Sequence, residues 1–479
     1  MSSTSTLNDK TNEPATLPPP VHGYAGMLNK DTVISELKVQ ATLSLPIAVM
    51  NLAWFGKTAI TTIFLGRLGE LTLAGGALGI TFANVTGFAI LNGICGAVEA
   101  ICGQAQGAQN IKLLHKTLVM TILLLCFISV PITFLWIHID RVLISFGQQV
   151  DISIVARDFV SYLVPDLFIT SFFCPLKAYL SSQSITLPTM FISIAALVIH
   201  IPINIALSKA MGLKGVSMAV WITDLIIVVL LILYVVILEK RGSRWKVGGW
   251  WDQSFKEWIT LVKLGGSCCL NACLEWWCYE ILVLLSGHLK NAQEAVGVLA
   301  IVLNLENLFF SVILSLGTSV STRVSNELGA NQPDKAYASA LVSLALGFIL
   351  GWVGGLLMVA IRGGWAALFT HDKGIINGVK KIMLFMALGE VFNFPLAVCG
   401  GILRGVLSVF KFHGGLVGLF IGLIIGIITC LTLDLVFIVR TNWVKAAAKA
   451  QILANDHQLQ NVPKHDAEEL STIQENHQA

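Results

Sequence analysis

Two acidic side chains lie inside a long apolar stretch, where ionised groups are costly and usually functional. Residues 273–280 carry Glu275 and Glu280. The two acids are five positions apart, so they lie about 140° apart around a helix and cannot both point into one narrow cavity. Glu275 is the deeper of the two from the end marked by Lys263. A carboxylic acid held away from water can exchange a proton near neutral pH, which makes Glu275 a candidate proton carrier. A structural hydrogen bond to a neighbouring helix is the alternative.

Other ionisable residues occupy comparable apolar stretches. Glu390 lies within 375–402, and Asp166 lies within 152–176. Under the internal repeat described below, these two acids form a related pair, one in each half. Lys57 falls opposite Cys278 under the same repeat, so we expect it to face the same central space as the stretch that carries Glu275.

Two further acids have simpler interpretations. Glu306 is flanked by Asn304 and Asn307, whose amides could satisfy the carboxylate without any transport role. Asp224 lies in the last apolar stretch of the first half, where a structural role within that half is expected.

Several kinds of chemistry are excluded. The string Gly56-Lys57-Thr58 resembles a phosphate loop, but the first glycine of that motif is replaced by Asn51, so nucleotide binding is rejected. Cysteines between 268 and 278 lack the paired spacing of a zinc site. There is no HExxH metal site and no nucleophile with an identifiable base, so neither an enzyme nor a cofactor is expected. A net charge of +3 is too small to predict nucleic-acid binding.

Composition and segment length predict an all-α polytopic membrane protein. Hydrophobic residues make up 55% of the 479 positions and charged residues 12%, against about 25% charged in soluble domains. The apolar runs have the length of membrane-crossing helices and lack the short alternating pattern of barrel strands. We predict eleven spans, near 40–64, 71–100, 114–138, 152–176, 186–207, 214–238, 258–287, 294–321, 335–361, 375–402 and 414–439.

The chain contains an internal repeat with an offset of about 221 residues. Identical residues align at seven positions: Ile60, Gly66, Leu68, Ala74, Gly76, Leu78 and Ile80 fall on Ile281, Gly287, Leu289, Ala295, Gly297, Leu299 and Ile301. Such a repeat in an apolar chain predicts two related helical bundles. Between Arg404 and Gly415 the offset drops to 200, a loss of roughly one helix length. A twelfth span is therefore expected to be deleted near 405–414, leaving six plus five spans.

The distribution of lysine and arginine predicts orientation and domain organisation. Basic residues are concentrated between 240 and 263 and are sparse after the first, third and seventh spans, which places the N-terminus and the middle loop in the cytosol. The predicted order is a disordered cytosolic segment (1–38), an N-lobe of six spans (39–240), a cytosolic linker (241–257), a C-lobe (258–440) and a polar tail (441–479). Tryptophans mixed with lysines are compatible with a linker that lies on the membrane surface, but an interfacial tryptophan belt is the favoured interpretation.

Six short motifs together resemble the multidrug and toxic compound extrusion (MATE) transporters, most closely the plant members. They are Trp54-Phe55-Gly56-Lys57, Leu65-Gly66-Arg67-Leu68-Gly69, Cys102-Gly103-Gln104-Ala105, Leu274-Glu275-Trp276-Trp277, residues 321–330 (STRVSNELGA) and Gly401-Ile402-Leu403-Arg404-Gly405. The resemblance implies two six-helix lobes in a V and export of organic compounds in exchange for protons.

The resemblance also implies site residues. Glu275 matches the family's proton-linked glutamate, and Glu280 matches a second acid of eukaryotic members. The family's acid in the tenth span falls on Asn393 here, with Glu390 about one turn away as a stand-in. An aspartate that some prokaryotic members carry in the first span falls on Thr61. The family has an eleventh helix after Arg404-Gly405, where this chain departs from it.

These observations predict a secondary antiporter that exports or sequesters organic cations, secondary metabolites or xenobiotics in exchange for protons. Two alternatives remain: a truncated membrane protein that does not transport, and a flippase for lipid-linked substrates. The expected partners are small organic solutes, protons and the lipid bilayer, and the expected state is a monomer. The plasma membrane, the vacuole and the endosomal or Golgi membranes are all compatible with the sequence.

Overall fold

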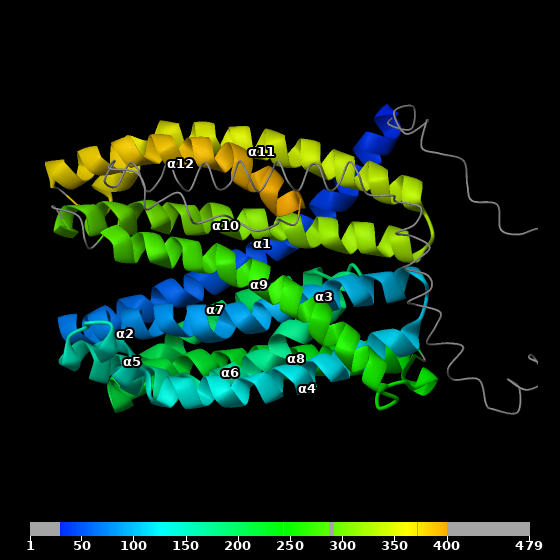
Figure 1. The fold of residues 1–479 in the computed structure, drawn as a ribbon, viewed down its shortest axis with the longest axis horizontal. Helices are drawn as coiled ribbons and strands as arrows, with labels where there is room; N and C mark the ends of the chain where they lie inside the picture. The colour runs from blue at the N-terminus through cyan, green and yellow to red at the C-terminus, as the bar shows by residue number, and fades with distance from the viewer. Residues whose placement is uncertain (1–28, 243, 287–291, 371, 400–479) are drawn as a thin grey trace, which may run out of the picture.

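A computed structural model describes residues 29–242, 244–286, 292–370 and 372–399, and these residues form an all-helical bundle (Figure 1). The side chains of several residues in the C-terminal half of α9 and at the start of α10, including Glu275 and Glu280, lie outside the description. The first half contains α1 (Lys30–Arg67), α2 (Glu70–Ala83), the π-helix η2 (Asn84–Phe88), α3 (Ala89–Gly107), α4 (Ile111–Ile137), α5 (Ile139–Ser145), α6 (Val150–Ser182), α7 (Leu187–Met211) and α8 (Leu213–Arg241). The second half contains the 3-10 helix η3 (Arg244–Val247), α9 (Phe255–Ser286), α10 (Ala292–Gly329), α11 (Pro333–Ala367) and α12 (Lys373–Cys399).

Most of these helices are long enough to cross a membrane. Within the described residues, nine helices are long and apolar enough to span a bilayer, counting α2, η2 and α3 as one continuous helix. At 32 residues, α9 also exceeds the length that a span requires. The ten predicted spans up to residue 402 therefore each correspond to a described helix. The span predicted at 414–439 and the deletion predicted near 405–414 lie outside the described residues.

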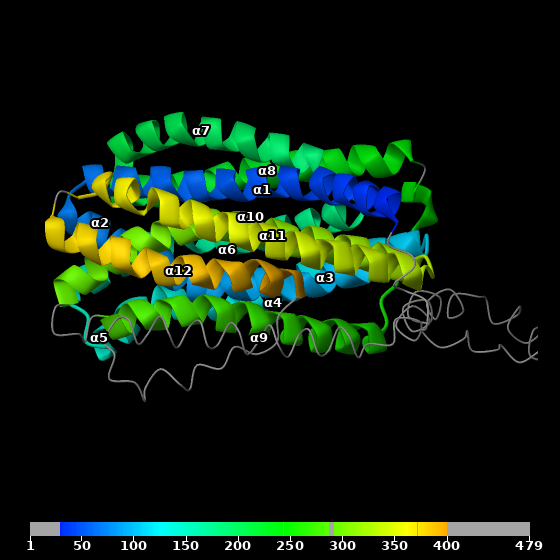
Figure 2. The ribbon, with the colours of Figure 1, turned by 90° about the horizontal axis from the view of Figure 1, so that it is seen from above.

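The helices form two bundles that lie side by side, joined by two crossing helices. In Figure 1, α10, α11 and α12 lie along one edge, and α2 to α8 form the other bundle. Helices α1 and α9, which begin the two halves of the repeat, run obliquely between the bundles. Figure 2 shows that they do so on opposite sides of the molecule. This arrangement is what two related six-helix units would produce, each beginning with a crossing helix.

Matching loops confirm that the repeat extends to the backbone. Gln109, between α3 and α4, has φ 56°, and Asn331, between α10 and α11, has φ 57°. The two residues are 222 positions apart and both adopt the left-handed conformation. Asn110 then caps α4 through its side-chain oxygen, which accepts from the Leu113 N–H at 3.1 Å.

Two local features differ from the sequence expectation. Residues 30–38, predicted to be disordered, form the first turns of α1. The helix starts early because Asp31 lies in its first turn, where a carboxylate is favoured by the helix dipole, and because Glu36 is held by a charged partner from another helix. The second span also contains the π-helix η2, which the hydrophobic pattern does not indicate.

Candidate functional site

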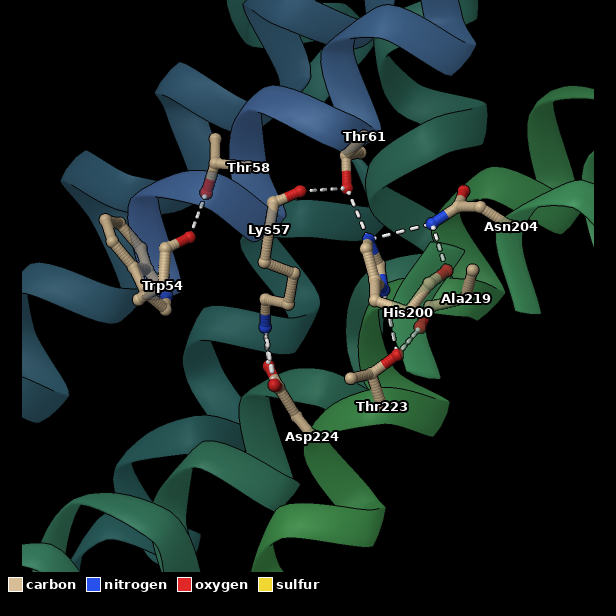
Figure 3. A network of polar contacts seen from close by, with 9 residues as sticks. All are labelled: Trp54, Lys57, Thr58, Thr61, His200, Asn204, Ala219, Thr223 and Asp224. Atoms are coloured by element: carbon tan, nitrogen blue, oxygen red, sulfur yellow. Dashed lines mark hydrogen bonds and ion pairs between the residues drawn. The ribbon is translucent and has the colours of Figure 1, made fainter. Parts of the chain in front are cut away.

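A buried ion pair lies in the first bundle, where α1 contacts α8. The Lys57 side chain is 7% exposed, and its ammonium donates to both carboxylate oxygens of Asp224, each at 2.5 Å (Figure 3). Helix α1 thus directs Lys57 into its own bundle. The expectation that Asp224 has a role within its half is consistent with this contact.

A hydrogen-bonded histidine lies beside this ion pair (Figure 3). His200 on α7 is fully buried, and its Nδ1 is 2.8 Å from the Thr223 hydroxyl on α8. Its Nε2 is 3.1 Å from the Thr61 hydroxyl on α1 and 2.7 Å from the Asn204 amide nitrogen, one turn along α7. One imidazole therefore links the three helices α1, α7 and α8.

The donors around His200 determine which protonation states fit. The Thr223 hydroxyl donates to the Ala219 carbonyl at 2.7 Å, so its oxygen accepts from Nδ1–H of His200. In the neutral ring Nε2 is then an acceptor, and the Asn204 amide donates to it. A protonated ring would instead donate from Nε2, and Asn204 would then have to turn its Oδ1 toward the ring; this oxygen has no hydrogen-bond partner among the described residues.

Asp166 adds a second carboxyl to this network. It lies on α6, is buried, and is within hydrogen-bonding reach of Asp224 and close to Lys57. Its Oδ1 has no hydrogen-bond partner of good geometry among the described residues. Lys57 is therefore the one cation that the described residues place beside these two carboxyls.

The second bundle contains a related pair of carboxyls. Glu306 on α10 and Glu390 on α12 are both buried and lie within hydrogen-bonding reach of each other. The Asn393 amide, one turn from Glu390, donates to Oε1 of Glu306 at 3.1 Å. Neither oxygen of Glu390 makes a hydrogen bond of good geometry with another described residue.

The two carboxyl pairs are related by the repeat. Asp166 and Glu390 are 224 positions apart, each in the fourth span of its half, and each faces a second acid from another helix. The sequence analysis paired these two acids, and the structure places each of them beside a second acid. The two pairs differ in how their negative charge is compensated. Lys57 supplies a cation in the first bundle, whereas Asn393 supplies a neutral amide in the second.

The remaining residues predicted for the site, Asn304, Glu275 and Glu280, are not among the side chains that the structure places in either carboxyl pair. Asn304 is exposed, and its amide donates to the Ala300 carbonyl of its own helix at 3.1 Å, so Glu306 receives its amide from Asn393 instead. Of the two sequence neighbours expected to satisfy Glu306, Asn304 therefore does not do so, because residues two positions apart in a helix project from different faces. Glu275 and Glu280 lie on α9, and their side chains lie outside the described residues.

Sequence reasoning missed the histidine network. His200 and Asn204 are four positions apart in an apolar span, a spacing that places two polar groups on one helix face and could have drawn attention to them. Thr61 and Thr223 carried no such signal, because single threonines are common in membrane helices and usually bond to their own backbone.

Comparisons with known proteins identify the family. The MatE family profile matches residues 46–206 and 268–432. Protein DETOXIFICATION 56 of Arabidopsis thaliana is 54% identical over 470 residues, covering 93% of this chain and 96% of that protein. Protein DETOXIFICATION 49 of the same plant is 39% identical, covering 86% of each.

The solved structures agree with the sequence matches. The crystal structure of the eukaryotic MATE transporter AtDTX14 superposes with a TM-score of 0.81 at 27% identity, covering 88% of this chain and 100% of that one. A Vibrio cholerae MATE transporter superposes with a TM-score of 0.72 at 16% identity, covering 89% and 100%, which shows a common fold. These matches confirm the prediction of a multi-pass membrane transporter rather than an enzyme. The chain belongs to the MATE family of transporters for organic solutes.

Proposed function

We propose that this protein is a proton-coupled antiporter of organic solutes and that the Glu306–Glu390 pair in the second bundle carries the exchanged proton. The observation behind the proposal is the contact between these two buried carboxyls. Two carboxylates this close repel each other when both are ionised in surroundings of low polarity, so holding one proton stabilises the pair.

Charge compensation favours the second bundle over the first as the coupling site. In the first bundle, the ammonium of Lys57 is covalently attached and pairs with Asp224. In the second bundle, the Asn393 amide donates to Oε1 of Glu306 and carries no charge. A proton or a cationic solute could supply positive charge to this pair.

Competition for that charge couples proton movement to solute movement. With the proton bound, the Glu306–Glu390 pair has less negative charge and attracts a cationic solute less. When the proton leaves, the pair regains its charge and binds the solute again. A proton taken up on one side of the membrane therefore promotes solute release on that side. Glu275 and Glu280 remain predicted contributors to the same step.

Proteoliposomes containing the full chain test the proposal. An imposed pH gradient should drive accumulation of a fluorescent organic cation such as ethidium. Glu390→Gln should abolish the dependence on the gradient, because glutamine keeps the shape of the side chain but cannot release a proton. Asp158→Asn is the matched control, since Asp158 is exposed and pairs with Arg157 on the surface.

A second measurement does not depend on the choice of solute. A protonated carboxylic acid has an infrared carbonyl band that the ionised form lacks. We expect a buried acid band near neutral pH that loses intensity in Glu390→Gln and is unchanged in Asp158→Asn. The proposal fails if the uptake of ethidium and of a panel of other organic cations does not depend on the pH gradient. It also fails if Glu390→Gln changes neither the dependence of uptake on the gradient nor the infrared acid band.

A further inference from the structure

Two acids at matching positions of the repeat each reach across to the opposite bundle. Glu36 lies near the start of α1 and Glu257 near the start of α9, 221 positions apart. Both are buried, although each lies close to a helix end. We call the end of the molecule that carries residues 242–254 the linker end, and the basic-residue pattern predicts that it faces the cytosol.

Glu36 pairs with a cation of the second bundle. Its Oε1 accepts from a guanidinium nitrogen of Arg323, on α10, at 2.7 Å, and Oε2 accepts from Nε at 3.4 Å. The side chains of Glu36 and Arg323 are only 11% and 16% exposed, so water screens the pair weakly. One turn further along α1, Gln40 bonds to Ser319 on α10 and to Ser339 on α11. The start of α1 is therefore fixed to the second bundle by charge and by neutral hydrogen bonds.

Glu257 makes the equivalent contact in the other direction. Its Oε1 accepts from the Lys116 ammonium, on α4 of the first bundle, at 2.9 Å, and the two side chains are 7% and 5% exposed. The start of α9 is thereby fixed to the first bundle. Each crossing helix thus carries, at the same position of the repeat, an acid that forms an ion pair with the opposite bundle.

The backbones of the two bundles also meet at the linker end. A methyl group built on Gly107 of α3 would overlap the Asn326 carbonyl of α10, and one built on Gly329 of α10 would overlap the Gln104 carbonyl of α3. Gly107 and Gly329 are themselves 222 positions apart and related by the repeat. Because only glycine permits this approach, the linker end is closed by direct backbone contact between the halves.

Each ion pair keeps one of its members satisfied when the bundles separate. Arg323 has a second carboxylate partner, Glu327, on its own helix at 2.7 Å. Glu257 also accepts from the Ser254 backbone N–H at 3.0 Å, which caps the start of α9. The freed partners Glu36 and Lys116 lie near helix ends, where opening would admit water. Breaking the pairs therefore costs less than leaving isolated charges buried, and the contacts can form and break repeatedly.

We propose that Glu36 and Glu257 are the gate residues of the linker end, holding it closed through the Glu36–Arg323 and Glu257–Lys116 ion pairs until the bundles rock apart to admit solute from that side. Transport by two related bundles requires each end to open in turn. The proposal depends on transport between the two bundles and is independent of what drives it.

Distance measurements between the bundles test this gate. A ketone-bearing unnatural amino acid placed at Gln109 and at Lys335, both exposed at the linker end, allows spin labelling without using the cysteines. In lipid nanodiscs, the wild-type chain should give mostly short distances. The double variant Glu36→Gln/Glu257→Gln should raise the ratio of long to short distances by about tenfold, and each single variant by about threefold.

Two controls separate gating from general damage. Glu70→Gln removes an exposed acid at the opposite end of the molecule and should leave the distances unchanged. The charge exchange Lys116→Glu/Glu257→Lys should restore the short distances that Glu257→Gln loses. The proposal is overturned if the Gln variants keep the wild-type distances, if they only lower the melting temperature, or if Glu70→Gln has the same effect. Should the double variant not purify as folded protein, the single variants and the charge exchange decide the question.

Discussion

Replacing Lys57 by methionine should destabilise the protein more than any other single change at its ion pair. Methionine retains the length of the side chain but removes the charge, which leaves the buried Asp166 carboxyl beside the partly buried carboxylate of Asp224. Removing one partner of a buried ion pair costs about 3–5 kcal/mol. With an unfolding entropy of about 2.1 cal/mol/K per residue, or roughly 1 kcal/mol/K for 479 residues, the melting temperature should fall by about 3–5 °C.

The structure also predicts an order among variants. Asp224→Asn should cost less than Lys57→Met, because the ammonium then still has Asp166 nearby.

Thermal unfolding in detergent, followed by size-exclusion chromatography with fluorescence detection, measures these effects. Arg157→Met is the matched control, because Arg157 is 38% exposed and its ion pair with Asp158 should be worth less than about 1 kcal/mol. The reasoning is refuted if Lys57→Met has the same melting temperature as the wild-type chain, or if Asp224→Asn lowers the melting temperature more than Lys57→Met does.

Three further predictions follow from single contacts and from the repeat. Gly107→Val should force α3 and α10 apart at the linker end and lower the melting temperature, whereas Gly364→Ala, in a helix with open space around it, should be neutral or slightly stabilising in the same assay. Asn393→Ala should lower the free energy of unfolding by about 1–3 kcal/mol, because it removes the amide that donates to a buried carboxylate. Asn304→Ala should change the free energy of unfolding by less than about 0.5 kcal/mol, and denaturant unfolding measures both. Sequencing the transcript should recover an insert of roughly 23 apolar residues near 405–414, a helix length; a messenger that reads as the present sequence would refute the deletion.

The spans could be predicted from sequence because the bilayer fixes their length and their polarity. The predicted span at 186–207 corresponds to the helix Leu187–Met211, and the predicted span at 335–361 corresponds to the helix Pro333–Ala367. The structure extends the predicted ends because helices continue past the hydrocarbon region with polar turns, which hydropathy does not count. The hydropathy pattern does not predict the short helix Ile139–Ser145, because this helix is far too short to form a span.

The partners of the buried charges could not be predicted, because they depend on how each helix is rotated about its axis. Lys57 and Asp224 are 167 positions apart, and nothing in either local sequence indicates the other. The repeat carried more information: it paired Asp166 with Glu390 before any contact was known. It could not show that an amide on α12, at the position where the family resemblance places an acid, donates to a carboxylate on α10.

The repeat preserved the two carboxyl pairs and changed what surrounds them. In the first bundle, Lys57 provides a permanent countercharge, and the neighbouring His200 is held by uncharged donors and acceptors in its neutral form. In the second bundle, Asn393 orients Glu306 without contributing charge. A permanent countercharge allows a carboxyl pair to remain in one state while the protein moves, which suits a structural element. Under the proposed function, the Glu306–Glu390 pair instead changes its charge when a proton enters or leaves. The same ancestral arrangement would then act as a fixed brace in one bundle and as the exchanging site in the other, and Lys57 on α1 is the residue that gives the first pair its countercharge.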